Sequence, residues 1–357
     1  MDGRERTLHI LRREQTDRVG LYEHFWDDTY KAWLREGHYR EGQAFEDLFR
    51  FDMQEHWAFN LTADLDFVPQ VLAQTEDTVT ILDGNGATLR RHRKHDTTPE
   101  HIAYRVSDRE SWDRLARPLL KADPRRIDFE GYRRKKQVAR AAGRAFFLGG
   151  VNVFESIHPL CGHVNMLLGM ADDPGWVQDM AEVYADLIIS LQKTLFEREG
   201  LPDGVWYYED MGFKGSPFMS PAMYSDIIQP AHARTIAFAH GLGLPVILHS
   251  CGYVEPLLPG LVEAGIDCLQ VIEVKAGMDL LKLNRLYGRR IAFMGGIDVR
   301  ALYSNDRRVI DRELESKLPA MMETANYVVH SDHSIPKTVR FDTYRYFIDR
   351  AMELGRY

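Results

Sequence analysis

The 357-residue sequence is poor in cysteine and lacks any long apolar run. Its three cysteines cannot form a disulfide framework, and the odd number suits a reducing compartment. No stretch approaches the roughly 20 apolar residues that span a bilayer. The charged segment 1–18 has no apolar region of the kind found in signal peptides. We therefore expect a cytoplasmic protein.

Excess positive charge and a dinucleotide fingerprint are also missing. The net charge is −8, which argues against a nucleic-acid backbone as the main partner. No GxGxxG motif opens a helix, so a dinucleotide-binding fold is disfavoured. The composition is 45% hydrophobic and 27% charged, close to the average for soluble globular chains, and it predicts a large folded core.

Short β-rich apolar runs alternate with amphipathic helical segments along the chain. Seven runs stand out: 19–24, 146–151, 205–209, 245–250, 268–273, 291–295 and 327–330. This alternation indicates a parallel sheet covered by helices. An eighth strand, either within 52–60 or hidden by the insertion described below, would complete a (β/α)₈ TIM barrel. A doubly wound open sheet is the alternative.

Residues 70–106 differ from the rest of the chain. The runs 74–82 and 87–93 flank Asp83-Gly84-Asn85-Gly86, which is a strong hairpin signal. We expect an antiparallel excursion that serves as a lid or an interface. It would belong to an insertion at about 50–145 within a single domain spanning 1–357, giving the barrel an amino-terminal β-hairpin and helical elaboration.

Polar and ionisable residues follow the apolar runs where each run ends. They are Glu23, His24, Asn152, Glu155, Glu209, Asp210, His249, Cys251, Glu273, Asp298, Asp332 and His333. In a barrel the carboxyl ends of all the strands lie on one side, so these groups are expected to converge on one mouth.

The His249-Ser250-Cys251 segment offers the sharpest chemistry. Residues i and i+2 of an extended chain point to the same side, so the imidazole and the thiol can face one ion. This pair suits Zn²⁺, with His333 as the expected third ligand. His330 competes with His333, although its place inside a run favours a core or supporting histidine. A buried cysteine beside a hydrogen-bonded histidine is the structural alternative.

Further residues are assigned to catalysis and substrate binding. Glu209 and Asp210 form a carboxylate pair suited to acid–base work, and Glu209 is also a candidate fourth ligand. His24 is the third catalytic candidate. The predicted substrate-binding residues are Asn152, Glu155, His158, Glu273 and Asp298.

Three segments together resemble the carboxyl half of the uroporphyrinogen decarboxylase superfamily. They are HSCGYVEPLLPGLVEAGIDCLQVIE at 249–273, GMDLLKLNRLYGRRIAFMGGID at 277–298 and HSDHSIP at 330–336. Similarity of a lower grade extends from about residue 15 to 355. The resemblance implies a (β/α)₈ barrel.

The superfamily has two branches. Its decarboxylases carry an arginine-rich RQAGRY-type loop and an FSD-type segment, whereas this chain has TDRVGLYEHFWDDTYKAWLREG at 16–37. Its zinc-dependent methyltransferases carry an H-x-C pair that matches His249 and Cys251, and usually a further cysteine where this chain has His333. The resemblance therefore implies Zn²⁺ and methyl transfer between a small methylated compound or a thiol and a corrinoid (cobalamin-type) partner protein.

Two other hypotheses remain open. One is a metal-free decarboxylase of a uroporphyrinogen-like polycarboxylate that uses His24, Glu209 or Asp298. The other is a non-catalytic barrel that sequesters a corrinoid or a tetrapyrrole.

Overall fold

A parallel sheet of eight strands forms the centre of the protein in the computed structural model, which describes residues 1–94 and 99–357. Its strands are β1 (Gly20–Leu21), β2 (Met53–Trp57), β7 (Ala145–Val151), β8 (Gly204–Tyr208), β11 (Val246–Ser250), β12 (Cys268–Val271), β13 (Ala292–Gly295) and β14 (Tyr327–Val329). All seven expected runs contain strands, and the eighth lies within 52–60 as predicted.

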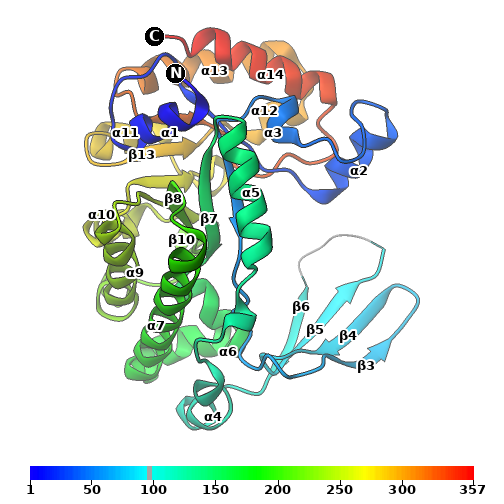
Figure 1. Ribbon diagram of the computed structural model, residues 1–357, viewed down its shortest axis with the longest axis vertical. Coiled ribbons are helices and arrows are strands. Elements are labelled where there is room, and N and C mark those ends of the chain that lie inside the picture. The colour runs from blue at the N-terminus through cyan, green and yellow to red at the C-terminus, as the bar shows by residue number, and fades with distance from the viewer. Residues whose placement is uncertain (95–98) are drawn as a thin grey trace.

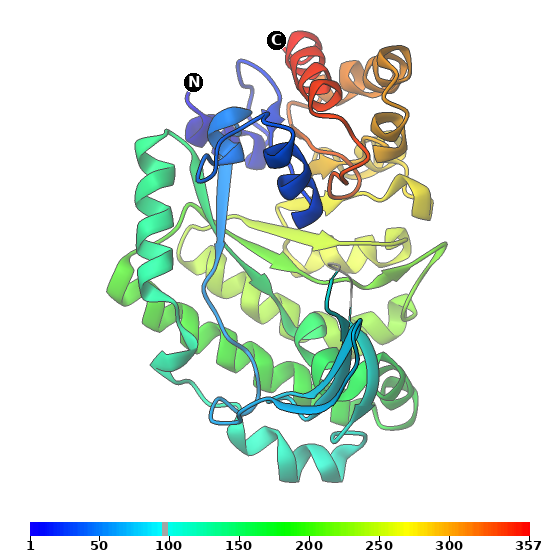
Figure 2. The ribbon, with the colours of Figure 1, turned by 90° about the vertical axis from the view of Figure 1, so that its right-hand side faces the viewer.

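The order of the strands distinguishes the two predicted architectures. The order is β1-β14-β13-β12-β11-β8-β7-β2, so each strand from β7 onward lies beside the strand that precedes it in this sheet, and the first strand lies beside the last. A doubly wound sheet would reverse direction at a switch point. The sheet is instead curled in the TIM-like manner, and the doubly wound alternative is wrong (Figure 2).

The two edge strands of the curled sheet, β1 and β2, meet at Asp52. The Asp52 N–H donates to the Leu21 carbonyl at 2.9 Å, and the Asp52 carboxylate accepts the Leu21 N–H at 2.9 Å. The same carboxylate accepts bonds from Arg6 at 2.6 Å and from Arg18 at 2.8 Å. One buried residue therefore joins the two edges where a ladder of backbone bonds would close a complete barrel.

We expect Asp52→Ala to destabilise the protein by about 3–5 kcal/mol, because it removes the buried carboxylate that Arg6 and Arg18 share and leaves the Leu21 N–H without its acceptor, while Arg6 keeps only the carboxylate of Asp17. Denaturant unfolding measures the loss. Glu315→Ala is the control, since Glu315 pairs with Arg350 at the surface and its removal should cost about 0–1 kcal/mol. Equal losses in the two variants would contradict a special role for Asp52.

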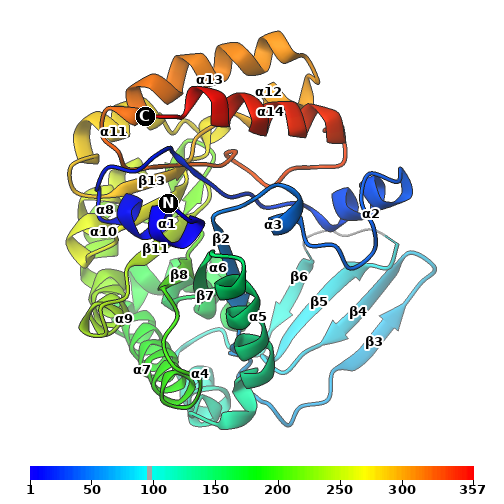
Figure 3. The ribbon, with the colours of Figure 1, turned by 45° about the horizontal axis from the view of Figure 1, so that its top comes forward.

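Helices cover the outside of the sheet (Figures 1 and 3). They are α1 (Gly3–Leu11), α2 (Asp27–Arg35), α3 (Phe45–Leu48), α4 (Arg109–Leu115), α5 (Phe129–Ala141), α6 (Val153–Asp172), α7 (Pro174–Glu199), α8 (Pro221–Met223), α9 (Gln229–Gly241), α10 (Leu258–Ala264), α11 (Leu280–Tyr287), α12 (Val299–Tyr303), α13 (Arg307–Met322) and α14 (Phe341–Leu354). Within the described residues, none of them combines the length and apolarity that crossing a membrane requires.

A separate antiparallel sheet lies in the segment between the neighbouring strands β2 and β7. Its strands are β3 (Gln70–Gln74), β4 (Thr78–Leu82), β5 (Ala87–His92) and β6 (Glu100–Tyr104). The hairpin predicted at Asp83–Gly86 joins β4 to β5. The run predicted at 74–82 is divided by a turn, in which the Thr78 N–H donates to the Thr75 hydroxyl at 2.9 Å. Residues 95–98 of the predicted excursion lie outside the described part of the chain.

This sheet projects from the side of the molecule, away from the curled sheet (Figures 1 and 3). A much smaller hairpin, β9 (Gly212–Phe213) with β10 (Ser216–Pro217), follows β8. The two ends of the chain lie on one side of the molecule, where the Val19 N–H donates to the Gly355 carbonyl at 2.9 Å (Figure 1).

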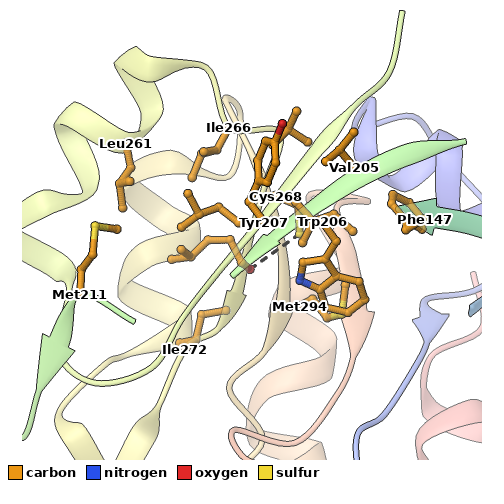
Figure 4. Close-up of a cluster of buried hydrophobic side chains, with 14 of the residues drawn as sticks. Phe147, Val205, Trp206, Tyr207, Met211, Leu261, Ile266, Cys268, Ile272 and Met294 are labelled. Atoms are coloured by element: carbon orange, nitrogen blue, oxygen red, sulfur yellow. Dashed lines mark hydrogen bonds between the residues drawn. The ribbon is translucent and has the colours of Figure 1, made fainter. Parts of the chain in front are cut away.

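The hydrophobic core lies on both faces of the parallel sheet (Figure 4). Trp206 and Tyr207 are both buried in β8 but point in opposite directions, because successive side chains of a strand alternate. Trp206 contacts Tyr22 inside the curled sheet, whereas the Tyr207 hydroxyl bonds Gln192 of α7 at 3.0 Å. Cys268 is fully buried in this core.

Candidate active site

A cavity of about 250 Å³ opens at the carboxyl ends of the parallel strands. It is lined by His24, Trp26, Glu55, Trp57, Tyr208, His249, Cys251, Gln270, Val271, His330, His333 and Ser334. A larger cavity of about 570 Å³ lies beside Arg18 and Arg50, which precede β1 and β2 and so mark the opposite end of the sheet. The smaller cavity is the candidate active site, because the ionisable groups converge there.

Asp210, His249 and Cys251 form a compact group at the wall of this cavity. The His249 Nε2 atom lies 3.3 Å from Cys251 Sγ and 3.1 Å from an Asp210 carboxylate oxygen. One ligand atom from each residue lies within 4.8 Å of the other two, and in the described part of the chain this is the one group of three metal-binding side chains that does so. The geometry predicted for the His249-x-Cys251 pair is thus observed.

The strand register brings Asp210 to this pair. His249 of β11 lies beside Tyr208 of β8, and Asp210 is two residues further along, on the same side as Tyr208. The Asp210 carboxylate also accepts the backbone N–H of Cys251 at 2.8 Å. A carboxylate, an imidazole nitrogen and a thiol sulfur are all ordinary zinc ligands, so this donor set fits Zn²⁺.

The charges within this group support one another. Burial alone would raise the pKa of Asp210, but the His249 imidazolium lowers it to about 2. Burial alone would lower the pKa of His249, but Cys251 and Asp210 raise it well above its usual value. The group therefore attracts positive charge, which a divalent cation can supply in place of the proton.

His333 lies on the same cavity as His249 and Cys251, but it is not a member of the compact group. Its ring contacts Trp26, with 5.8 Å between the ring centroids. Burial lowers the pKa of His333 and so favours the neutral ring. A neutral imidazole has one nitrogen with a lone pair, which can bind a metal. The structure thus offers two candidates for a third ligand, Asp210 in contact with the pair and His333 across the cavity.

A second polar group, made by His24, Glu55 and Tyr208, occupies another wall of the cavity. The Glu55 carboxylate lies 2.9 Å from His24 Nε2 and accepts bonds from the Tyr208 hydroxyl at 2.9 and 3.0 Å. The Trp57 indole N–H donates to the same carboxylate at 3.1 Å. Burial would raise the pKa of Glu55, but the bond and the charge of His24 lower it. This carboxylate is therefore ionised and paired at neutral pH.

Glu55 and Tyr208 were not among the predicted site residues. Glu55 lies in β2, the strand that the sequence indicated least clearly, between Met53 and Trp57 on the same face. A glutamate flanked on its own strand face by Met53 and Trp57 was the available signal, because a buried carboxylate needs partners that only a site or an ion pair supplies.

His330 is almost fully buried just after β14, at 1% exposure, yet it reaches the floor of the cavity. The Nε2 atom of His330 lies 3.0 Å from His24 Nδ1. His330 is not part of the compact group of Asp210, His249 and Cys251. The position inside the fold agrees with the expectation of a supporting histidine.

Glu209 is not on the cavity, and its expected placement there is wrong. Its carboxylate is fully buried and accepts the backbone N–H groups of Phe154 and Glu155, at 3.0 and 2.7 Å, so it caps the first turn of α6. His232 lies 2.9 Å from the same carboxylate. Alternation explains the difference, because Tyr208 and Asp210 point toward the cavity and the intervening residue points toward the helices.

The predicted substrate-binding residues also lie away from the cavity lining. Asn152 is fully buried and its side-chain amide donates to Thr235 at 2.9 Å. Glu155 pairs with His158 at 2.6 Å on α6. Asp298 pairs with Arg300 at 2.6 Å. None of these residues lines the cavity beside His249, and each pairs instead with a residue of α6, α9 or α12. Their assignment to substrate binding stays a prediction.

Glu273 supports the compact group of Asp210, His249 and Cys251 indirectly. Its carboxylate accepts the backbone N–H of Gly252 at 2.7 Å and so holds the turn that follows Cys251. Gly252 has a φ of 80° and packs directly on Gly212, where an added Cβ would lie 2.3 Å from the Gly212 carbonyl carbon. A side chain at position 252 would therefore displace this turn.

The curled parallel sheet, with its ionisable groups at the carboxyl ends of the strands, defines a TIM-like protein with an enzyme-type site. The family model for uroporphyrinogen decarboxylase (URO-D) matches residues 159–354, and the chain belongs to that family.

Two further similarities were found. Over 90 residues it is 31% identical to a methylated-thiol–coenzyme M methyltransferase of Methanosarcina mazei, a match that spans 25% of this chain and 23% of the relative. A solved structure of a methyltransferase from Methanosarcina mazei has the same fold, with a TM-score of 0.71 over 99% of both chains at 13% identity.

Proposed function

We propose that this protein is a zinc-dependent methyltransferase that moves a methyl group between a small methylated compound or a thiol and a corrinoid protein. The observation that carries the proposal is the compact group of Asp210, His249 and Cys251 beside a cavity. The similarity to a methylated-thiol methyltransferase supports the reaction class. The corrinoid partner follows from the family resemblance.

Zinc bound here would lower the pKa of a substrate thiol or polarise the leaving atom of a methyl donor. His249 and Cys251 would hold it, with either Asp210 or His333 as the third ligand. The protein's remaining task is to orient the substrate and to manage its proton. His24 is placed for the proton, since its imidazole faces the cavity while Glu55 balances its positive charge.

The decarboxylase alternative finds less support in the cavity. A substrate with several carboxylates needs cationic partners, and no Arg or Lys is among the described residues that line the cavity. A non-catalytic role as a binding module is distinguished by turnover, since a binding module would transfer no methyl group.

The identity of the third ligand is tested by comparing Asp210→Asn with His333→Ala. The variant that removes a true ligand is expected to lose about a quarter of the zinc-binding free energy of a four-ligand site, which is about 2.5–4 kcal/mol. This loss corresponds to a fall in zinc affinity of roughly 10²–10³-fold. The other variant should bind zinc nearly as the unmodified protein does. Competition against a chromophoric chelator measures both affinities, and absence of zinc binding by the unmodified protein would refute the proposal.

A further inference from the structure

Gln270 of β12 connects the metal-binding group to the buried His330. Its side chain is fully buried, and it lies beside His249 in the strand register. The Gln270 Oε1 atom contacts His249 Nδ1, and its Nε2 atom lies 3.4 Å from His330 Nε2. We infer that His330 and Gln270 are positioning residues that determine which ring nitrogen of His249 is free to bind a metal, an inference that rests on the proposed function for the metal itself.

The chain of contacts starts at a main-chain carbonyl. His330 Nδ1 contacts the carbonyl oxygen of Ser331, and a Glu23 carboxylate oxygen lies 3.2 Å from the same nitrogen. A carbonyl oxygen can only accept a hydrogen bond. His330 Nδ1 must therefore carry a hydrogen, whatever the protonation state of Glu23.

The opposite nitrogen of His330 is then an acceptor. Burial, followed by the charge of His24, lowers the pKa of His330 well below its usual value, so the ring is neutral. A neutral imidazole has one N–H, which is already assigned to Nδ1. The lone pair of His330 Nε2 faces His24 Nδ1 at 3.0 Å and the Gln270 amide at 3.4 Å.

This acceptor fixes the orientation of the Gln270 amide. The two ends of an amide differ, since its nitrogen donates and its oxygen accepts. With the nitrogen toward His330, the oxygen faces His249 Nδ1, so that nitrogen carries the hydrogen. When a metal replaces the second proton of His249, the lone pair is then on Nε2, the atom that lies beside Cys251 and Asp210.

A reversed amide would have the opposite effect. Its NH₂ group would face His249 Nδ1 and require a lone pair there, which places the hydrogen of the neutral ring on Nε2. That hydrogen would occupy the position that a metal needs. Metal-binding histidines commonly have their second nitrogen held in this way, and loss of the partner lowers metal affinity by about 10–100-fold.

The zinc affinities of three variants test the inference. Gln270→Leu removes the acceptor at His249 Nδ1, and its affinity should fall by about 10–100-fold. Gln270→Glu keeps an acceptor for the His249 Nδ1 hydrogen in either orientation, because both carboxylate oxygens accept hydrogen bonds. This variant should bind zinc close to normally. A packing role alone predicts the reverse order, because a buried carboxylate costs more than a leucine. His330→Phe should weaken binding in the natural background and have no further effect in the Gln270→Glu background.

His232→Phe is the matched control, because His232 is also a fully buried, hydrogen-bonded histidine but contacts Glu209 and Tyr224 away from the cavity. Its zinc affinity should equal that of the unmodified protein. Circular dichroism and thermal unfolding establish that each variant is folded. If the unmodified protein binds zinc and Gln270→Leu binds it equally well, the inference is wrong.

The tautomer of His330 is measured without any metal. Nitrogen NMR of protein labelled with ¹⁵N-histidine should show His330 with hydrogen on Nδ1 and a lone pair on Nε2, the signal being assigned by its loss in His330→Phe. Hydrogen on Nε2 would overturn the inference. A correct tautomer in a protein that binds no zinc would refute the proposed function and leave the orientation of Gln270 standing.

Discussion

Replacement of Cys251 by alanine is expected to lower zinc affinity by about 10²–10³, since each ligand of a four-ligand site contributes about 2.5–4 kcal/mol. Transfer of a methyl group from methylcobalamin to a thiol should fall to background. The cause is local, because Cys251 would supply the thiolate to a bound zinc ion and its Sγ atom is 3.3 Å from His249 Nε2. Zinc competition and the visible spectrum of the corrinoid measure the two effects.

Cys268→Ala is the matched control for this experiment. Cys268 is a cysteine like Cys251, but it is fully buried in β12, the strand beside β11. Its removal leaves a small cavity and should lower stability without changing zinc content. Equal zinc affinity in Cys251→Ala and Cys268→Ala would contradict a metal site at the end of β11.

Glu55→Gln is expected to slow methyl transfer by about 10²–10⁴ while zinc binding is retained, the range over which a positioned acid or base contributes. The neutral amide cannot balance a positive charge on His24, which lies 2.9 Å from the Glu55 carboxylate. It also replaces one acceptor oxygen by a donor that opposes the Tyr208 hydroxyl or the Trp57 N–H. Steady-state kinetics with methylcobalamin and a series of thiols measures the effect.

Two further comparisons define what Glu55 does. If it supports proton transfer, kcat should fall more than KM changes, whereas a purely structural role would appear as a loss of stability. Glu199→Gln is the control, because Glu199 of α7 pairs with Arg133 of α5 outside the curled sheet, away from the cavity. Normal kinetics in Glu55→Gln would remove His24 and Glu55 from the proposed mechanism.

The sequence predicted the main fold because its signals are local. A run such as 245–250 is continuously apolar up to Leu248, without the alternation of a half-exposed strand, which indicates a strand buried on both faces. The Asp83–Gly86 turn likewise predicted the β4–β5 hairpin. The segment 74–82 was misjudged because the turn at Thr75 is formed by side-chain and backbone bonds that leave little trace in composition.

The sequence predicted how side chains of one strand end lie relative to one another, but not how those of different strands meet. His249 and Cys251 lie two residues apart on one strand end, so alternation alone indicates that they face the same side. Glu209 and Asp210 are adjacent, and the sequence does not reveal which of them points inward. The register between β8 and β11 decides this, by placing Tyr208 beside His249 and thereby Asp210 beside Cys251.

The sequence by itself determined the alternation of strands and helices, the family and the pairing of His249 with Cys251 at one strand end, since each depends on residues close together in the chain. Only the tertiary structure decided that Glu55 from β2, Gln270 from β12 and His330 after β14 share one cavity. These residues are more than 50 positions apart from one another. Their meeting depends on the order of the strands around the curled sheet and on the register of each pair, which arise from packing of the whole chain.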